Sequence, residues 1–209
     1  MEKIKKKEIT QKRILSSART IFAQHSYNAA SIRMIAAEGG FDFGLIRYHF
    51  PNKAELFKTI IKQACDELYD VNEKGLKGIE KMSPENGFSL YLDRVLKHNF
   101  DHPKTLRILM NNIYRPQTPG FEIPGYDHVP QVLSLMRETF KKNIPMSAPQ
   151  KEIHRFIDSF NAQILMFVGA SSCNSKMLGL KPETSGYRLW VKETLMYIFL
   201  PHLKRLLFQ

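Results

Sequence analysis

The side chains best suited to chemistry lie in one short stretch, GGFDFGLIRYHFPNKAEL, residues 39–56. Arg47, Tyr48 and His49 are consecutive there, and Lys53 follows shortly after them. A guanidinium can bind guanine or phosphate through two parallel hydrogen bonds, and phenol, imidazole and ammonium groups bond phosphate oxygens. All four groups are suited to holding an anion. The stretch therefore predicts a surface that contacts nucleic acid.

A second pair of reactive groups lies in the segment KHNFDH, where His98 and His102 are four positions apart. On a helix this spacing puts both imidazoles on one face, where they can hold a metal ion. Asp101 is adjacent, but the sequence offers no clear third ligand, and we find no nucleophile elbow, phosphate loop or paired carboxylates. We therefore expect no enzyme activity and no cofactor, and a helical metal-binding enzyme remains an alternative.

The charge balance also favours an anionic partner. The chain has 209 residues, with 31 lysines and arginines against 20 acids and a net charge of +11. Residues 1–63 carry 12 basic residues against 5 acids, which leaves +7 of that charge in the first third of the chain. This asymmetry predicts a small basic module ahead of a larger, less charged body. We place the boundary between residues 1–55 and 56–209.

The cysteines and the residues that follow the basic N-terminus indicate the cellular compartment. Cys65 and Cys173 are far apart without metal-binding spacing, which is typical of a reducing compartment. No apolar run follows the basic N-terminal residues, and the most apolar stretch is too short to span a bilayer. The C-terminal LPHLKRLLFQ is basic and amphipathic but short, so membrane association is the weaker alternative. We expect a cytoplasmic protein without a membrane partner.

Apolar residues recur at helical spacing and strand-like alternation is absent, so we expect an all-α fold of about nine helices. The first three are expected over residues 8–25, 32–39 and 42–50, with Ser31 and Asp42 as N-caps. A long fourth helix should start after Asn52. The remaining helices are expected over 84–100, 103–114, 130–143, 150–172 and 184–208, with Pro201 kinking or ending the last one.

Two short helices joined by the turn at Gly39 and Gly40, docked on a preceding helix, describe a helix-turn-helix. In this motif the second short helix enters the DNA major groove. Ile46 and Phe50 are four apart and should face the core, which leaves the rest of the helix for DNA. The residues expected to contact DNA are Ser31, Arg33, Asp42, Phe43, Gly44, Leu45, Arg47, Tyr48, His49 and Lys53.

The segment ILSSARTIFAQHSYNAASIRMIAAEGG, followed by FDFGLIRYHFPNKAELF, resembles the N-terminal domain of TetR-family transcriptional regulators over residues 10–68. The residues that match the family pattern at and after the recognition helix are His49, Phe50, Lys53, Glu55 and Leu56. The resemblance implies a DNA-binding regulator, most simply a repressor, whose helical body binds a small molecule. That ligand would shift the DNA-binding domains away from the spacing that DNA requires. Arg47 stands where the family most often has an aromatic residue, so no operator sequence is implied.

One helix-turn-helix contacts few base pairs, so we expect a homodimer on an inverted repeat of double-stranded DNA. The last two long helices should form the interface as a four-helix bundle, as the resemblance also implies. The residues expected at this interface are Ile164, Phe167, Ala170, Trp190, Thr194, Tyr197 and Ile198.

Methionine and aromatic side chains in the body can line an apolar cavity for a small, largely apolar effector, whose existence the resemblance implies. The residues expected to line it are Met110, Tyr114, Met136, Phe140, Phe160 and Asn161. The same residue types at helical spacing also build an ordinary core. An architectural DNA-binding dimer that needs no ligand therefore remains an alternative.

Overall fold

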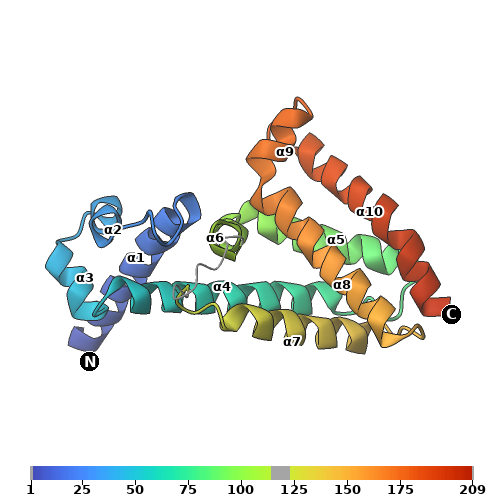
Figure 1. The fold of residues 1–209 in the computed structure, drawn as a ribbon, viewed down its shortest axis with the longest axis horizontal. Coiled ribbons are helices and arrows are strands. Elements are labelled where there is room, and N and C mark those ends of the chain that lie inside the picture. The colour runs from blue at the N-terminus through green and yellow to red at the C-terminus, as the bar shows by residue number, and fades with distance from the viewer. Residues whose placement is uncertain (1, 114–122, 209) are drawn as a thin grey trace.

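The computed structural model describes residues 2–113 and 123–208, and every regular element in those ranges is helical. The prediction of an all-α fold is confirmed. The elements are α1 (Glu2–Gln24), α2 (Ile32–Gly39), α3 (Phe43–His49), α4 (Lys53–Leu76), α5 (Pro84–Asp101), α6 (Lys104–Ile113), α7 (His128–Asn143), α8 (Gln150–Ile164), the π-turn η1 (Leu165–Gly169), α9 (Ser171–Met177) and α10 (Ser185–Phe208). Helices α1–α3 lie at one end of an elongated molecule and α10 at the other (Figure 1).

The caps of the three helices α2–α4 explain where each begins. Ser31 Oγ accepts a hydrogen bond from the amide three residues later at 3.2 Å, and Asn52 Oδ1 does the same at 2.9 Å. Asp42 Oδ1 accepts from the amide two residues later at 2.7 Å. Gly40 ends α2 in the left-handed conformation, with φ of 63°, which a residue without Cβ adopts readily. Residues next to each helix end therefore determine where the helices of the helix-turn-helix begin and where α2 ends.

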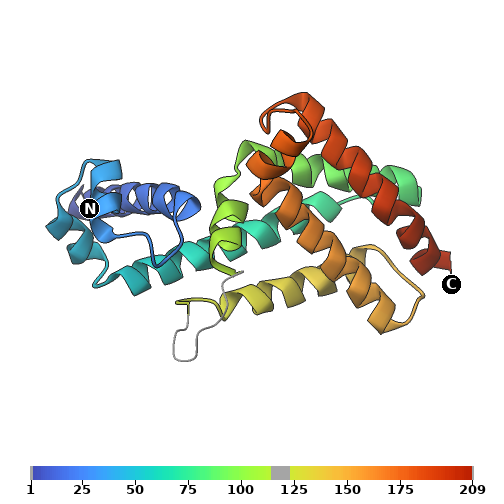
Figure 2. The same cartoon turned by 45° about the horizontal axis from the view of Figure 1, so that its top comes forward.

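Helix α4 joins the two parts of the molecule. Near its start, Phe57 is fully buried, and its ring lies 4.7 Å from that of Phe22 and 4.8 Å from that of Tyr27. Further along, α4 packs beside α7 and α5 in the body (Figure 2). The boundary expected between residues 55 and 56 falls inside the first turn of this helix. No helix in the described ranges combines the length and apolarity needed to cross a membrane.

The expected single helix over residues 150–172 is wrong. Helix α8 ends at Ile164, and the chain makes the π-turn η1 before α9 begins at Ser171. A Cβ on Gly169 would lie 3.1 Å from the sulfur of Met110, so the glycine lets this turn pass close against α6. In addition, Pro201 does not end α10, which continues to Phe208.

Candidate nucleic-acid interface and body cavity

Helix α3 is held to the protein by one face only. Ile46 is fully buried and Phe50, its C-cap, is 6% exposed. The outer face stays open, with Tyr48 72% exposed, Phe43 38% and Leu45 36%. An isolated protein gains nothing by leaving three large apolar or aromatic side chains beside one another in water. The arrangement therefore suits a surface that is covered by a partner.

Cationic side chains are stacked on the aromatic rings of this surface. The Arg47 guanidinium lies 4.7 Å from the centre of the Phe43 ring, and the Lys7 ammonium of α1 lies 5.4 Å from that of Tyr48. Stacking occupies the flat face of a guanidinium and leaves its N–H edge free for base edges or phosphates. The charge of Lys7 is thus brought beside α3.

Lys53 also has a structural role, which the sequence did not predict. Its Nζ donates to the carbonyl of Tyr27 at 2.8 Å and to that of Ala30 at 3.0 Å, and it lies 4.3 Å from the centre of the Tyr27 ring. These bonds tie the loop between α1 and α2 to the start of α4. An ammonium has three N–H groups, so one remains for a phosphate.

Replacing Lys53 with alanine should therefore reduce the free energy of unfolding by about 1–2 kcal/mol, because two loop carbonyls lose a charged donor. Denaturant titration followed by circular dichroism measures this loss. Lys58→Ala, an exposed lysine on the same helix, is the matched control and should change stability little. Equal stabilities for the two variants would contradict the structural role.

The remaining expected DNA contacts divide into structural and exposed groups. Ser31 and Asp42 use their side-chain oxygens as caps, and a Cβ on Gly44 would lie 2.9 Å from Asp42 Oδ1, so glycine also protects that cap. Arg33 is exposed beside them on α2. Burial, and then the charge of Lys7, lower the pKa of His49. This favours a neutral imidazole in the free protein.

Comparison with known protein families finds the same helix-turn-helix. Residues 14–60, which run from α1 into α4, match the model of the family described as bacterial regulatory proteins, tetR family. This segment carries a DNA-binding domain of the TetR type. The expectation drawn from residues 10–68 is therefore confirmed.

The curated relatives of this chain are regulators. An HTH-type transcriptional repressor of Streptomyces coelicolor is 30% identical over 105 residues, which are 49% of this chain and 48% of that protein. An uncharacterized HTH-type transcriptional regulator of Bacillus subtilis is 27% identical over 104 residues, which are 48% of this chain and 47% of that protein. The chain thus spans about half the length of these curated relatives.

Solved structures extend the likeness to the whole TetR-type fold. The transcriptional regulator FadR of Bacillus subtilis, solved in complex with stearoyl-CoA, matches with a TM-score of 0.66 over 92% of this chain and 98% of that one. Sequence identity is 10%, so this match establishes the fold alone.

The body of the chain contains a cavity of about 320 Å³ between α4, α5, α6, α7 and α8. The expected residues that line it are Met136, Phe160 and Asn161. Met110 packs instead against Gly169 of η1, and Phe140 lies in the core, 5.8 Å from the ring of Tyr91. Tyr114 lies outside the described residues.

The cavity lining also includes buried Asn72 and Asn99, which we did not predict from the sequence although each interrupts an apolar helix face.

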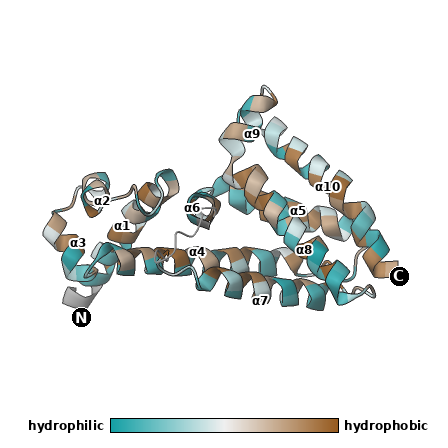
Figure 3. Cartoon of the chain, viewed as in Figure 1, coloured by the Kyte–Doolittle hydropathy of each residue, from teal (hydrophilic) through white to brown (hydrophobic). Residues whose placement is uncertain are grey.

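The expected interface residues differ in how much surface they present. Tyr197 is 83% exposed and Ile198 37%, whereas Ile164 is buried in the body. Phe167 and Trp190 are partly buried against each other, with ring centres 5.5 Å apart. Ala170 and Thr194 are also partly buried. Apolar residues recur along the whole of α10 (Figure 3), so this helix has apolar side chains beyond those that face the core.

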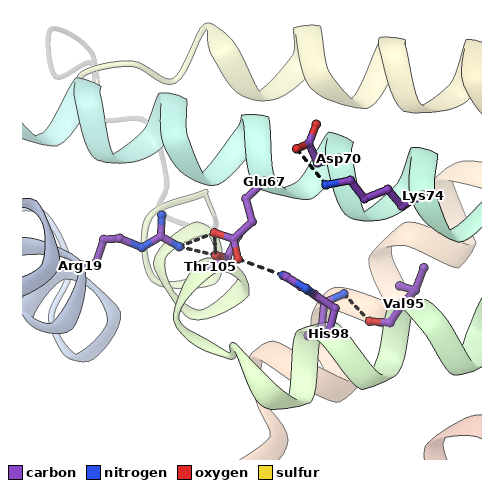
Figure 4. A network of polar contacts seen from close by, with 8 residues as sticks. Arg19, Glu67, Asp70, Lys74, Val95, His98 and Thr105 are labelled. Atoms are coloured by element: carbon purple, nitrogen blue, oxygen red, sulfur yellow. Dashed lines mark hydrogen bonds and ion pairs between the residues drawn. The ribbon is translucent and has the colours of Figure 1, made fainter. Parts of the chain in front are cut away.

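A polar network joins the helix-turn-helix to the body (Figure 4). Glu67 of α4 is at its centre, accepting from Arg19 of α1 at 2.6 Å and from Thr105 of α6 at 2.7 Å. His98 Nε2 of α5 lies 3.1 Å from the other carboxylate oxygen. His98 therefore has a partner in the fold, and within the described ranges no three His, Cys, Asp or Glu side chains gather as a metal site around it or His102.

Glu67 should make this junction sensitive to acid. Burial raises the pKa of Glu67, but hydrogen bonds from Thr105 and His98 and the charge of Arg19 outweigh it, so the net pKa is below the usual 4.5. The stabilisation is therefore present above about pH 4.5 and is lost as the pH falls through the lower, folded-state value. Glu67→Gln should lose about 1–2 kcal/mol near neutral pH and depend less on pH between about 5 and 3.

Urea titrations across this pH range measure the effect. Glu73→Gln makes the same chemical change on the same helix, where Glu73 has no ion-pair partner among the described residues. It should follow the wild-type pH profile. A Glu67→Gln profile parallel to that of the wild type would show that the network contributes nothing to stability.

Proposed function

We propose that the protein is a sequence-specific DNA-binding transcriptional regulator that acts as a homodimer, most simply as a repressor. The observation that carries the proposal is the outer face of α3, where Arg47, Tyr48 and Phe43 are open to solvent while Ile46 anchors the helix from behind. The match to the family model and the basic charge of the first third of the chain support it. The repressor relative in Streptomyces coelicolor supports the direction of control.

Pairing of two copies is supported by exposed apolar side chains at the C-terminal end of α9, just after it, and on α10. They are Met177 at 82%, Leu178 at 39%, Leu189 at 55%, Tyr197 at 83% and Ile198 at 37% exposure. Sedimentation velocity tests the pairing. Leu189→Asp should convert dimers to monomers, whereas Leu135→Asp, at a similarly exposed position on α7, should leave them intact.

An effector that releases DNA completes the proposal. The apolar cavity beside α4 and α6 supports it, and so does the structural neighbour that was solved with stearoyl-CoA. The free dimer would sample arrangements that do and do not fit DNA, and a ligand with higher affinity for the second would deplete the first. Moving most of the population requires several kcal/mol of differential affinity. Without this ligand dependence, the protein would be an architectural DNA-binding dimer.

Selection of bound sequences from random duplexes tests the DNA-binding part. We expect an inverted repeat whose half-sites are centred about 34–36 Å apart, one turn of DNA. Absence of any enriched sequence would reject a specific regulator. Gel shifts of the selected duplex with and without candidate effectors then separate a ligand-released regulator from an architectural protein.

A further inference from the structure

A buried side-chain amide on the wall of the body cavity has, among the described residues, a hydrogen bond to its oxygen but none from its nitrogen. Asn72 of α4 lines the cavity and is 3% exposed, at a position where helix periodicity would put an apolar residue between Leu68 and Leu76. Its Oδ1 accepts a hydrogen bond from the Tyr91 hydroxyl at 2.7 Å. Its Nδ2 has no hydrogen-bond partner in the described part of the chain.

A buried amide N–H without an acceptor is unfavourable, because it has given up its bonds to water without replacing them. The neighbouring polar groups do not supply an acceptor for this N–H. The Tyr91 phenol is a donor to the same amide, and burial raises its pKa, which keeps it protonated. The amide of Asn99, also on the cavity wall, donates to the carbonyl of Val95 at 2.8 Å. Within the described ranges, Nδ2 is therefore an unpaired donor on a residue of the cavity wall.

The charged groups of the cavity lining are already paired with each other. Arg137 of α7 makes a two-pronged contact with Asp158 of α8, with Nη2 2.9 Å from each carboxylate oxygen. The Asp158 side chain is 51% exposed, which places this pair toward the solvent side of the cavity. An anionic ligand would have to displace Asp158 from Arg137. The described wall is otherwise mostly apolar.

We propose that the cavity binds an uncharged, largely apolar molecule with one hydrogen-bond-accepting oxygen, such as the carbonyl of a ketone or ester, held by Asn72 Nδ2. The volume of about 320 Å³ is at the small end of the range for ligand pockets. The inference rests on the proposed effector site, and it adds the chemical class of the ligand and the residue that recognises it. Asn72 sets specificity because an apolar molecule of equal size leaves its N–H unpaired.

Three probes of equal size and different chemistry test this. Acetophenone has a carbonyl, cumene replaces that carbonyl with an apolar branch, and benzoate replaces it with a charged carboxylate. Equilibrium dialysis of the full chain, without DNA, measures the affinity of each. Binding of neither acetophenone nor cumene at millimolar concentration would reject the cavity as a ligand site. Tighter binding of benzoate than of acetophenone would assign the cavity to anions and overturn the proposal.

The decisive variant removes both partners of the buried hydrogen bond. Asn72→Leu combined with Tyr91→Phe leaves no orphaned group, so the fold should tolerate it. We expect acetophenone to bind about threefold to tenfold more weakly to this variant, while the affinity for cumene is unchanged or higher. Tyr91→Phe alone keeps Asn72 Nδ2, so it should weaken acetophenone binding less than the double variant does. Parallel changes for both probes in the double variant would contradict a role for Asn72.

A measurement on the wild type needs no variant. The carbonyl stretching band of bound, isotope-labelled acetophenone should lie at the lower frequency of a hydrogen-bonded ketone. A band at the position seen in an apolar solvent would overturn the proposal. These tests use protein without DNA, so their outcome is independent of whether selection from random duplexes yields an operator.

Discussion

Arg47→Ala should weaken binding to the selected duplex by about 1–3 kcal/mol, roughly fivefold to 150-fold, and relax the sequence preference at one position of each half-site. The guanidinium is exposed and lies over the Phe43 ring, so the change removes a proposed DNA contact without opening the core. Fluorescence anisotropy with the selected duplex and single-base variants of it measures both effects.

The matched control for Arg47 is Arg155→Ala. Arg155 is an exposed arginine of α8, so its replacement changes the net charge equally but far along the chain from α3. It should affect DNA affinity only weakly, through the overall charge. Both variants should unfold within about 0.5 kcal/mol of the wild type, as is usual for surface substitutions. Unchanged affinity and specificity for Arg47→Ala would remove α3 as the reading helix.

Phe57→Ala should reduce the free energy of unfolding of the helix-turn-helix by about 3–5 kcal/mol. The ring is fully buried and packs edge-on against Phe22 and beside Tyr27, so truncation leaves a cavity where α1 meets α4. Most of the stability of a small domain is then lost, and DNA binding should disappear with the fold. Thermal and urea unfolding followed by circular dichroism measure the change.

Tyr48→Ala is the matched control for this second substitution. Tyr48 is also an aromatic residue of the helix-turn-helix, but it is 72% exposed. Its replacement should leave stability nearly unchanged while weakening DNA binding. The two variants therefore separate loss of fold from loss of contact. If Phe57→Ala were as stable as Tyr48→Ala, the packing between α1 and α4 would not hold the domain together.

The helix-turn-helix was predictable from sequence because its determinants are local. Ser31, Asp42 and Asn52 cap the helices that immediately follow them, and Gly40 ends α2 through its own backbone conformation. The hydrogen bonds of Lys53 within the protein were not predictable, for the opposite reason. Its carbonyl partners lie 26 and 23 residues earlier in the chain, so only the folded domain brings them within reach.

The cavity and the break after α8 were less predictable, since both depend on how helices cross. Met110 and Met136 are the same residue type at similar apolar positions, but only Met136 lines the cavity. The close passage of Gly169 against α6 interrupts a helix whose apolar periodicity continues without a gap. Asn72 was the clearest missed signal, because a polar residue on an otherwise apolar face marks a special environment.

Helix α4 runs without a break from the helix-turn-helix to the cavity, so a tilt at one end displaces the other end. Ile60, in the core near the helix-turn-helix, and Asn72, on the cavity wall, belong to one helix and are separated by about 18 Å at 1.5 Å per residue. A tilt of about 5° about the Asn72 end would move the Ile60 end by about 1.6 Å, and two paired copies would double the change. Under the proposed function, a ligand bound beside Asn72 would therefore change the spacing of the two α3 helices in a dimer.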